Sequence, residues 1–288
     1  MVKNNLWGGR FKKGPSAELV ALSVSTQFDF VLAPYDIAGS IAHANALQKA
    51  DLLSETEHKQ ITDALKQMRD ELTDAENPLT YNESDEDVHS ALERILIERV
   101  GVETGGKLRA GRSRNDQIAT FVRMYLRDSA ASIKALLAEY CGAISARAEE
   151  VFADKAVVAG RTHMQHAQPV LLAHQLMAHA WPMLRNIDRL NDFVTRLGGS
   201  PYGSGALAGN TFGMDADAIA KELGFEMPEF NSIDATASRD LVAEMLYILA
   251  QISIDMSRFA EEIIIWNTKE FDYITLADEY STGSSIMP

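Results

Sequence analysis

The sequence predicts an all-α fold, and three observations lead to that prediction. Apolar residues recur at helical spacing over most of the chain, and helix-start signals precede several of these segments. No run of alternating apolar and polar residues is bounded by hairpin turns. The 288 residues are 46% hydrophobic and 24% charged, the composition of a globular protein with a sizeable core. At about 150 residues per domain, this length predicts two packed regions.

Three helices are expected in the first part of the chain. The segment 35–53 carries apolar residues spaced by three or four. The sequences Ser54-Glu-Thr-Glu57 and Ser84-Asp-Glu-Asp87 each place a serine where it can accept from the third helical N–H, with acidic residues in the first turn. They predict helices over about 55–74 and 86–100. We therefore expect a small N-terminal helical domain over residues 1–111.

Three longer helices are expected after this domain. Apolar residues repeat at spacings near 3.5 from Asn115 to Ala153, which predicts a helix of roughly 35 to 40 residues. Further helical patterns cover about 170–197 and 239–268. The last is apolar nearly all round its middle, so it needs neighbours on every side. We expect a central long-helix bundle over residues 112–288 that continues across a subunit interface.

Charge and cysteine content exclude several classes of protein. The formal net charge is −14, so most of the surface repels nucleic acid and anionic lipid. Cys141 is the only cysteine, which excludes an internal disulfide and favours a reducing compartment. The first residues lack a secretory signal, and Glu244, Asp255 and Arg258 interrupt the most apolar segment, 241–266. We expect a cytoplasmic protein with neither nucleic-acid nor membrane partners.

Polar segments between the helices are the expected place for chemistry. Gly111-Arg-Ser-Arg-Asn-Asp-Gln117 brings guanidinium groups to a helix start, where free N–H groups also favour a carboxylate. An ordinary capped helix start is the alternative interpretation. Gly160–Pro169 contains His163 and His166, which can transfer protons near neutral pH. No acidic or cysteine residue lies near them in sequence, so a metal site is not expected. Further polar segments cover 203–210, 231–240 and 279–288.

With these motifs the sequence resembles the fumarase/aspartase superfamily of helical lyases and, within it, the argininosuccinate lyase family. The most specific matches are Leu6-Trp-Gly-Gly-Arg-Phe11 and Gly111–Gln117, whereas Gly283-Ser-Ser-Ile-Met-Pro288 is shared across the superfamily. Other matching segments are Ser84–Ser90, Thr162–Pro169, Leu207–Asn210, Asp234–Thr236 and Ser238–Asp240. The resemblance implies cofactor-free cleavage of argininosuccinate to arginine and fumarate, in arginine biosynthesis. It also implies a homotetramer in which three chains meet at each active site.

The resemblance further implies roles for individual residues. Ser284 and His163 match the pair that removes and donates the protons, and which residue does which is left open. Six further residues are expected to bind or orient the substrate: Ser25, His89, Arg112, Asn115, Thr162 and Arg239. No cofactor and no metal are implied.

One departure from the family pattern concerns the end of the chain. The family signature continues after Met287-Pro288 with Gln-Lys-Lys-Asn-Pro, further bundle helices and a C-terminal domain. We therefore expect a C-terminally truncated chain with an incomplete bundle, weak substrate binding and little turnover.

Two alternatives to this function stay open. Sister lyases that act on adenylosuccinate, aspartate or fumarate share the superfamily motif, although the two specific motifs disfavour them. A non-catalytic, crystallin-like protein would share the scaffold, but this chain has Thr162, His163 and Ser284 in place.

Overall fold

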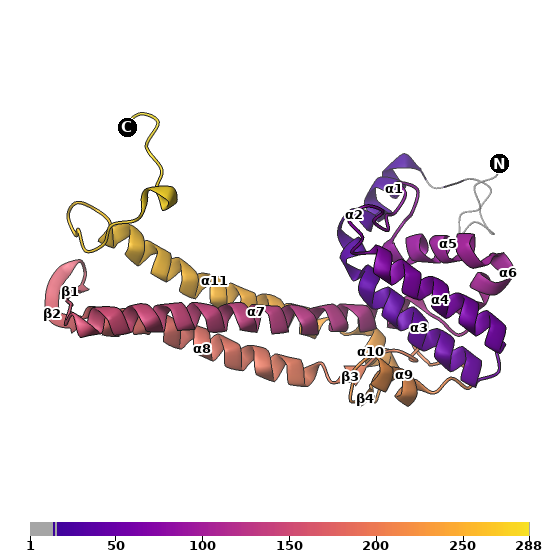
Figure 1. Cartoon of the computed structure of the whole chain (residues 1–288). Helices are drawn as coiled ribbons and strands as arrows, with labels where there is room; N and C mark the ends of the chain where they lie inside the picture. Colours follow the sequence, from indigo (N-terminus) through magenta and orange to yellow (C-terminus); the bar gives the residue numbers. More distant parts are fainter. Residues whose placement is uncertain (1–13, 15, 288) are drawn as a thin grey trace. The chain divides into compact units, whose positions relative to one another are not determined.

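The computed structural model describes residue 14 and residues 16–287, which form two compact units (Figure 1). Unit 1 extends to residue 127 and also includes 197–239, whereas unit 2 comprises 128–196 and the chain from residue 240 onward. Each unit is defined by its internal contacts and combines two separate segments of the chain. The division into domains 1–111 and 112–288 is a different kind of division and stays a prediction. The motif at 6–11 lies outside the described residues.

Unit 1 contains the three helices predicted for the first part of the chain. They are α3 (Ala33–Lys49), α4 (Glu55–Glu71) and α5 (Val88–Val100). Their apolar faces share one core, whose most buried members include Ile37, Leu47, Ile61, Met68 and Leu96. The shorter elements of this unit are α1 (Ala17–Ser23), α2 (Thr26–Asp29), η1 (Phe30–Leu32), α6 (Val102–Gly105), η2 (Gly106–Arg109), β3 (Gly199–Ser200), α9 (Ala216–Glu222), β4 (Met227–Pro228) and α10 (Ser232–Ala237).

Side-chain caps determine where α4 and α5 begin. Ser54 Oγ accepts from Glu57 N over 3.3 Å, and Glu57 Oε2 accepts from Ser54 N over 3.0 Å, which is the predicted capping box. Helix α5 begins later than predicted because Asp87, rather than Ser84, is its cap. Asp87 Oδ1 accepts from Ser90 N over 2.7 Å, and Ser90 Oγ accepts from Asp87 N over 3.0 Å. Ser84 lies in the preceding turn.

A second apolar cluster in unit 1 joins segments that are distant in sequence. Tyr202, Ile219 and Phe225 pack with Phe121 from the first part of α7 (Arg114–Ala153) and with small residues of α3. Gly39 of α3 is required for this packing, because a Cβ there would overlap the Phe121 ring. The chain returning at residue 197 therefore completes the core of unit 1.

Unit 2 is built on the three long helices that the sequence predicts (Figure 1). These are the remainder of the 40-residue α7, α8 (Leu172–Arg196) and α11 (Asp240–Trp266). Ile144 of α7, Leu176 of α8 and Trp266 of α11 share an apolar core. A short turn, η3 (Asp278–Tyr280), follows. None of the helices in the described residues is sufficiently long and apolar to span a bilayer.

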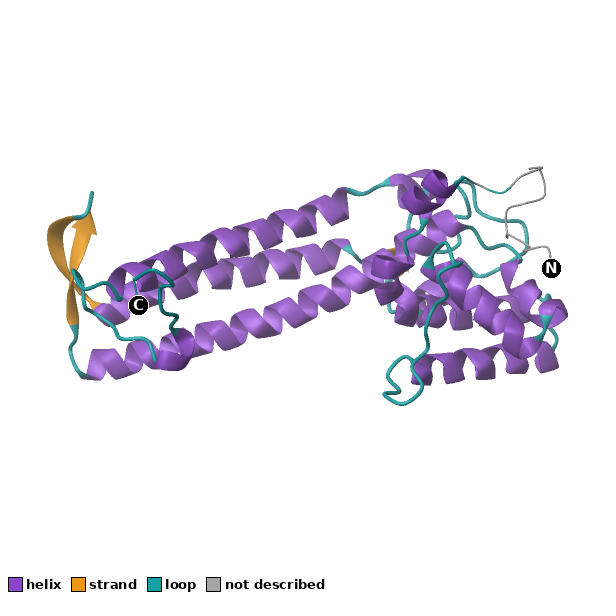
Figure 2. Ribbon diagram, turned by 90° about the horizontal axis from the view of Figure 1, so that it is seen from above, coloured by secondary structure: helices purple, strands orange, loops and turns teal. Residues whose placement is uncertain are grey.

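A β-hairpin corrects the expectation that the chain contains no paired strands (Figure 2). β1 (Val157–Thr162) pairs antiparallel with β2 (Gln165–Leu171). Most of β2 is exposed, so no buried face imposes an apolar and polar alternation on its sequence. The connecting residues, His163 and Met164, also lack the Asn-Gly or Asp-Gly signal of two-residue hairpins. Helices nevertheless dominate the architecture, and the predicted all-α class is confirmed.

Candidate functional site

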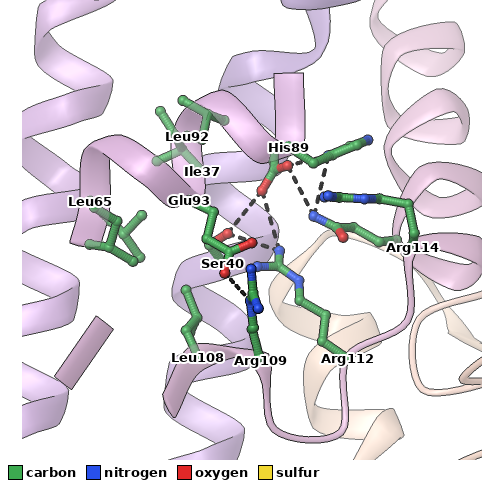
Figure 3. Close-up of a pocket in the computed structure, with 13 residues that line it drawn as sticks. Ile37, Ser40, Leu65, His89, Leu92, Glu93, Leu108, Arg109, Arg112 and Arg114 are labelled. Atoms are coloured by element: carbon green, nitrogen blue, oxygen red, sulfur yellow. Dashed lines mark hydrogen bonds and ion pairs between the residues drawn. The ribbon is translucent and has the colours of Figure 1, made fainter. Parts of the chain in front are cut away.

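In unit 1, the predicted residues His89 and Arg112, both labelled in Figure 3, meet at the buried carboxylate of Asp36. His89 Nδ1 forms a short hydrogen bond with Asp36 Oδ2. Arg112 Nη2 lies 3.3 Å from Asp36 Oδ1 and donates to Ser40 Oγ over 2.9 Å. Gln117 Nε2 donates to Asp36 Oδ2 over 3.0 Å. Helices α3, α5 and α7 and the loop before α7 therefore supply one buried polar network, which holds His89 and Arg112 in fixed positions.

Opposing effects act on the pKa of the Asp36 carboxyl. Burial raises its pKa, but the charges of His89 and Arg112 and hydrogen bonds from His89 and Ser40 lower the pKa to about 2. Asp36 is therefore ionised at neutral pH. An ionised carboxylate in this position stabilises the buried guanidinium of Arg112, on which the negative charges of Glu93 and Asp116 also act.

The network lines a cavity that Figure 3 shows, and its arginines are neutralised by acidic partners. Arg109 pairs with Glu93, Arg112 pairs with Asp36, and Arg114 Nε lies 3.5 Å from Asp87 Oδ2. Leu65, Leu92, Leu96 and Leu108 supply apolar walls. Because each cation already has a carboxylate, the cavity is not a ready anion site. The network is suited to orienting side chains.

Asp116 brings two of the predicted polar segments together at the start of α7. Its Oδ2 accepts from Gly203 N over 3.0 Å and from Gly205 N over 2.9 Å. Asn115 Nδ2 donates to Ala206 O over 3.3 Å. Gly203 and Gly205 have φ values of 101° and 62°, which favour glycine. The segments 111–117 and 203–210 therefore form one structure in unit 1.

The other predicted residues of unit 1 bond elsewhere. Ser25 Oγ donates to Asp29 Oδ2 over 2.5 Å. Arg239 Nη1 donates to the carbonyl oxygens of Thr236, over 3.1 Å, and Ser238, over 2.7 Å. These bonds position Ser25 beside α2 and Arg239 at the end of α10, outside the network around Asp36.

In unit 2, the predicted residues Thr162 and His163 lie together at the tip of the hairpin. His163 and Met164 form its two-residue turn, with φ values of 51° and 62°. Positive φ at both positions is the geometry of a type I′ turn, although it is uncommon for residues other than glycine, asparagine and aspartate. Thr162 and His163 are exposed, so the imidazole is accessible rather than buried in an apolar core.

Ser284 lies in an exposed segment that follows η3 in unit 2. Its Oγ accepts from Ile286 N over 3.3 Å and from Met287 N over 3.0 Å. In the part of the chain that the structure describes, no hydrogen bond joins Ser284 to His163. Likewise, no group of three or more His, Cys, Asp or Glu residues among the described residues is placed to hold a metal ion.

Two residues that contact the predicted ones, or the turn that carries them, were not expected from the sequence. Asp36 holds His89 and Arg112, but it lies within α3, 53 residues before His89. Arg161 contacts the turn that contains His163. Nothing in the sequence around Arg161 indicates that its side chain reaches this turn. The sequence marks Asp36 only as a polar residue within a helix, at a position where burial is expected.

A family model described as a lyase matches residues 9–288. The argininosuccinate lyase of Clavibacter michiganensis subsp. michiganensis is 60% identical over 283 residues, covering 98% of this chain and 56% of the relative. The argininosuccinate lyase of Cutibacterium acnes is 56% identical, covering 98% of this chain and 60% of the relative. The chain thus spans 56–60% of the length of these two curated relatives.

Solved structures agree with this match. A crystal structure of EDDS lyase in complex with formate is 30% identical, with a TM-score of 0.77, and the alignment covers 93% of this chain and 52% of that one. A fumarate lyase:delta crystallin from Brucella melitensis, bound to cobalt, is 19% identical with a TM-score of 0.74. That alignment covers 97% of this chain and 64% of the other, and shows the fold alone. Because the family model matches nearly all of the sequence, this chain belongs to the lyase family.

Proposed function

We propose that this chain contributes to an enzyme that cleaves the carbon–nitrogen bond of argininosuccinate, releasing arginine and fumarate. The observation that carries the proposal is 56–60% identity, over nearly the whole chain, to proteins named argininosuccinate lyase. The place of the reaction in arginine biosynthesis follows from that name. No cofactor is needed, because the reaction requires only a base, an acid and stabilisation of negative charge.

His163 and Ser284 are the proposed acid–base pair. One residue takes the proton from the carbon beside a carboxylate, and the electron pair forms the double bond of fumarate through an aci-carboxylate. The carbon–nitrogen bond breaks, and the other residue protonates the departing nitrogen. Support for His163 comes from its exposure at a two-residue turn. Support for Ser284 comes from its exposed position directly after Gly283.

The remaining predicted residues are proposed to bind or orient the substrate. Thr162 is adjacent to His163, and Asn115 lies at the start of α7, where backbone N–H groups favour an anion. Ser25 and Arg239 are proposed as further polar contacts. His89 and Arg112 are proposed to orient neighbouring groups, because Asp36 already engages both of them.

We also propose that the enzyme is a cytoplasmic homo-oligomer, with the tetramer as its final state. The support is an apolar surface on α11, which we call the outer face of α11. It consists of four exposed residues: Leu246, Tyr247, Ile254 and Ile264. They lie on the opposite side of the helix from its buried residues, which include Met245, Ile248 and Ile252. A second copy of the chain would remove this face from water.

An activity assay with a matched variant tests the proposed function. The chain is extended after Pro288 with the corresponding part of the Clavibacter relative, and fumarate release is followed by ultraviolet absorbance. Argininosuccinate should be cleaved, whereas adenylosuccinate and aspartate should not. His163→Asn should lower kcat by about 100-fold or more, with Thr195→Val as an exposed control in unit 2.

Two results would contradict the proposal. Preference of the extended chain for another substrate would assign it to a sister lyase. Absence of any cleavage, or an undiminished rate in His163→Asn, would favour a non-catalytic protein on the same scaffold.

A further inference from the structure

The hairpin of unit 2 contains an arginine whose contacts the proposed function does not use. We propose that Arg161 is a positioning residue, whose guanidinium holds the His163–Met164 turn in the conformation that presents the His163 imidazole. The inference rests on the proposed role of His163 in proton transfer. It concerns how that imidazole is held, and Arg161 itself is not proposed to contact the substrate.

The turn needs an external restraint because its backbone is unfavourable for its side chains. His163 and Met164 both have positive φ, at 51° and 62°. For a residue with a Cβ this region is crowded by the following carbonyl, and such residues persist only where the surroundings hold them. Asn-Gly would adopt the same turn without strain. The sequence instead has a histidine and a methionine here, so the conformation must be stabilised by contacts from outside the turn.

Arg161 supplies these contacts with both of its terminal nitrogens. Nη1 donates to Met164 O over 3.1 Å, and so engages the carbonyl of the second turn residue. Nη2 lies 2.7 Å from His166 Nε2, which accepts the bond because a guanidinium has no acceptor. Arg161 and His166 are also partners in the strand register. The planar fork therefore spans the turn from β1 to β2, which a single ammonium group cannot reproduce.

An irregularity in the ladder accompanies this placement of the Arg161 side chain. The register shifts between Ala159, which faces Pro169, and Arg161, which faces His166. Gly160 lies at the shift, where a Cβ would approach Gln168 O to 2.7 Å. A bulge changes the direction in which neighbouring side chains point. Without it, the alternation of the strand would place Arg161 differently relative to the turn.

Phe271 connects Arg161 to the core of unit 2. The guanidinium carbon lies 4.4 Å from the centroid of the Phe271 ring, the geometry of a cation–π contact. Phe271 packs against the core cluster of Trp266 and meets Tyr273 edge to face, at 5.7 Å between ring centroids. The mostly exposed hairpin is thereby tied through Arg161 to a part of the unit that does not depend on the turn.

The first test measures the turn itself in the 288-residue chain. Arg161→Gln and Arg161→Lys are compared with Arg147→Gln, which removes an exposed arginine of α7 that pairs with Glu150. Hydrogen exchange of peptides over 157–171 is followed by mass spectrometry. Arg161→Gln should accelerate exchange in the hairpin about tenfold, Arg161→Lys less, and Arg147→Gln not at all. Exchange in α8 should be unchanged.

The second test measures catalysis in the extended chain. Arg161→Gln should lower kcat by about tenfold to 100-fold, because a small displacement of a reacting group has this effect, while KM changes less than twofold. The apparent pKa values of the kcat profile should stay in place, and Arg161→Lys should recover part of the rate. Phe271→Leu should lower kcat similarly, and the double variant should be no worse than Arg161→Gln alone, since both act through one contact.

Three results would overturn the inference. Unchanged hairpin exchange in Arg161→Gln would show that the turn holds itself. Faster exchange throughout unit 2, with a lower Tm, would make Arg161 a general structural residue. Faster hairpin exchange with normal kcat would separate the turn from catalysis. An inactive parent chain overturns the proposed function instead, and the exchange experiment still decides whether Arg161 holds the turn.

Discussion

At the scale of single residues, the buried His43 gives unit 1 a defined response to acid. His43 lies on α3, fully shielded from water, and its Nε2 lies 3.0 Å from Ala110 O. Burial lowers its pKa from 6.5 to about 3, and the nearby charge of Arg112 acts in the same direction. The folded protein therefore keeps this imidazole neutral at pH values where the unfolded chain protonates it.

We expect stability to decrease as the pH falls from about 6.5 towards 4. Above pH 6.5 the His43 imidazole is neutral in both the folded and the unfolded state. As the pH falls from 6.5 towards the folded pKa of about 3, only the unfolded chain gains this proton, which lowers the free energy of unfolding. Within this window, one proton contributes a slope of about 1.4 kcal/mol per pH unit. Urea denaturation of the parent and of His43→Gln, followed by circular dichroism at pH 4.5 to 7, measures it. An equal slope in both proteins would contradict this assignment.

The residue scale also shows where sequence reasoning stops. His89 and Arg112 were identified through motifs, because both lie in segments with a distinctive local sequence. Asp36, which holds them, lies 53 residues before His89 and 76 before Arg112, so only the folded chain reveals the pairing. A motif identifies which residues are present but not which atoms they bond. The roles of the eight predicted site residues stay predictions for the same reason.

At the scale of elements, caps show which helix boundaries a sequence can predict. The capping box of α4 depends on residues three apart, so Ser54 and Glu57 were recognisable together. For α5, three acidic residues and two serines within 84–90 are possible caps, and in the structure Asp87 and Ser90 form the cap. The hairpin had no comparable local signal. Its exposed strands do not alternate apolar and polar residues, and its His163–Met164 turn lacks the Asn-Gly or Asp-Gly sequence that is typical of two-residue hairpins.

Removing the cap of α4 should destabilise unit 1. Ser54→Ala loses the acceptor for Glu57 N, which should lower the free energy of unfolding by about 1 kcal/mol. Ser54→Asp keeps an acceptor at the cap, so its free energy of unfolding should stay within a few tenths of a kcal/mol of the parent value. Urea denaturation followed by circular dichroism measures both. If Ser54→Ala matches Ser54→Asp, the capping box contributes nothing to stability.

At the scale of the whole molecule, the outer face of α11 is the surface that we propose for association between copies of the chain. Its four exposed apolar residues lie on one side of the helix, and the buried residues of α11 occupy the other. Because this helix lacks a polar face, the sequence predicted that it needs neighbours on every side. Periodicity alone could not say which side of α11 packs inside the chain. Large exposed apolar surfaces of this kind mark interaction sites.

The parent chain should sediment as a species larger than the 31.7 kDa monomer. Leu246→Glu combined with Ile254→Glu places two charges on the outer face of α11 and should shift the chain towards the monomer, because a charge buried at an interface is strongly unfavourable. Gln60→Glu combined with Gln67→Glu adds the same charge on exposed positions of α4 and serves as the control. Sedimentation velocity measures all three. A monomeric parent, or equal shifts in both variants, would contradict a role for this face.

The discontinuous course of unit 1 has a consequence for synthesis on the ribosome. Phe121 can contact its partners Ile219 and Phe225 only after about a hundred further residues have been translated, which takes about 5 to 20 s at ordinary rates of elongation. During that interval the nascent chain exposes an unfinished apolar surface. Translation speed over the intervening stretch, and chaperones that shield emerging polypeptides, therefore become determinants of how much correctly folded protein a cell obtains.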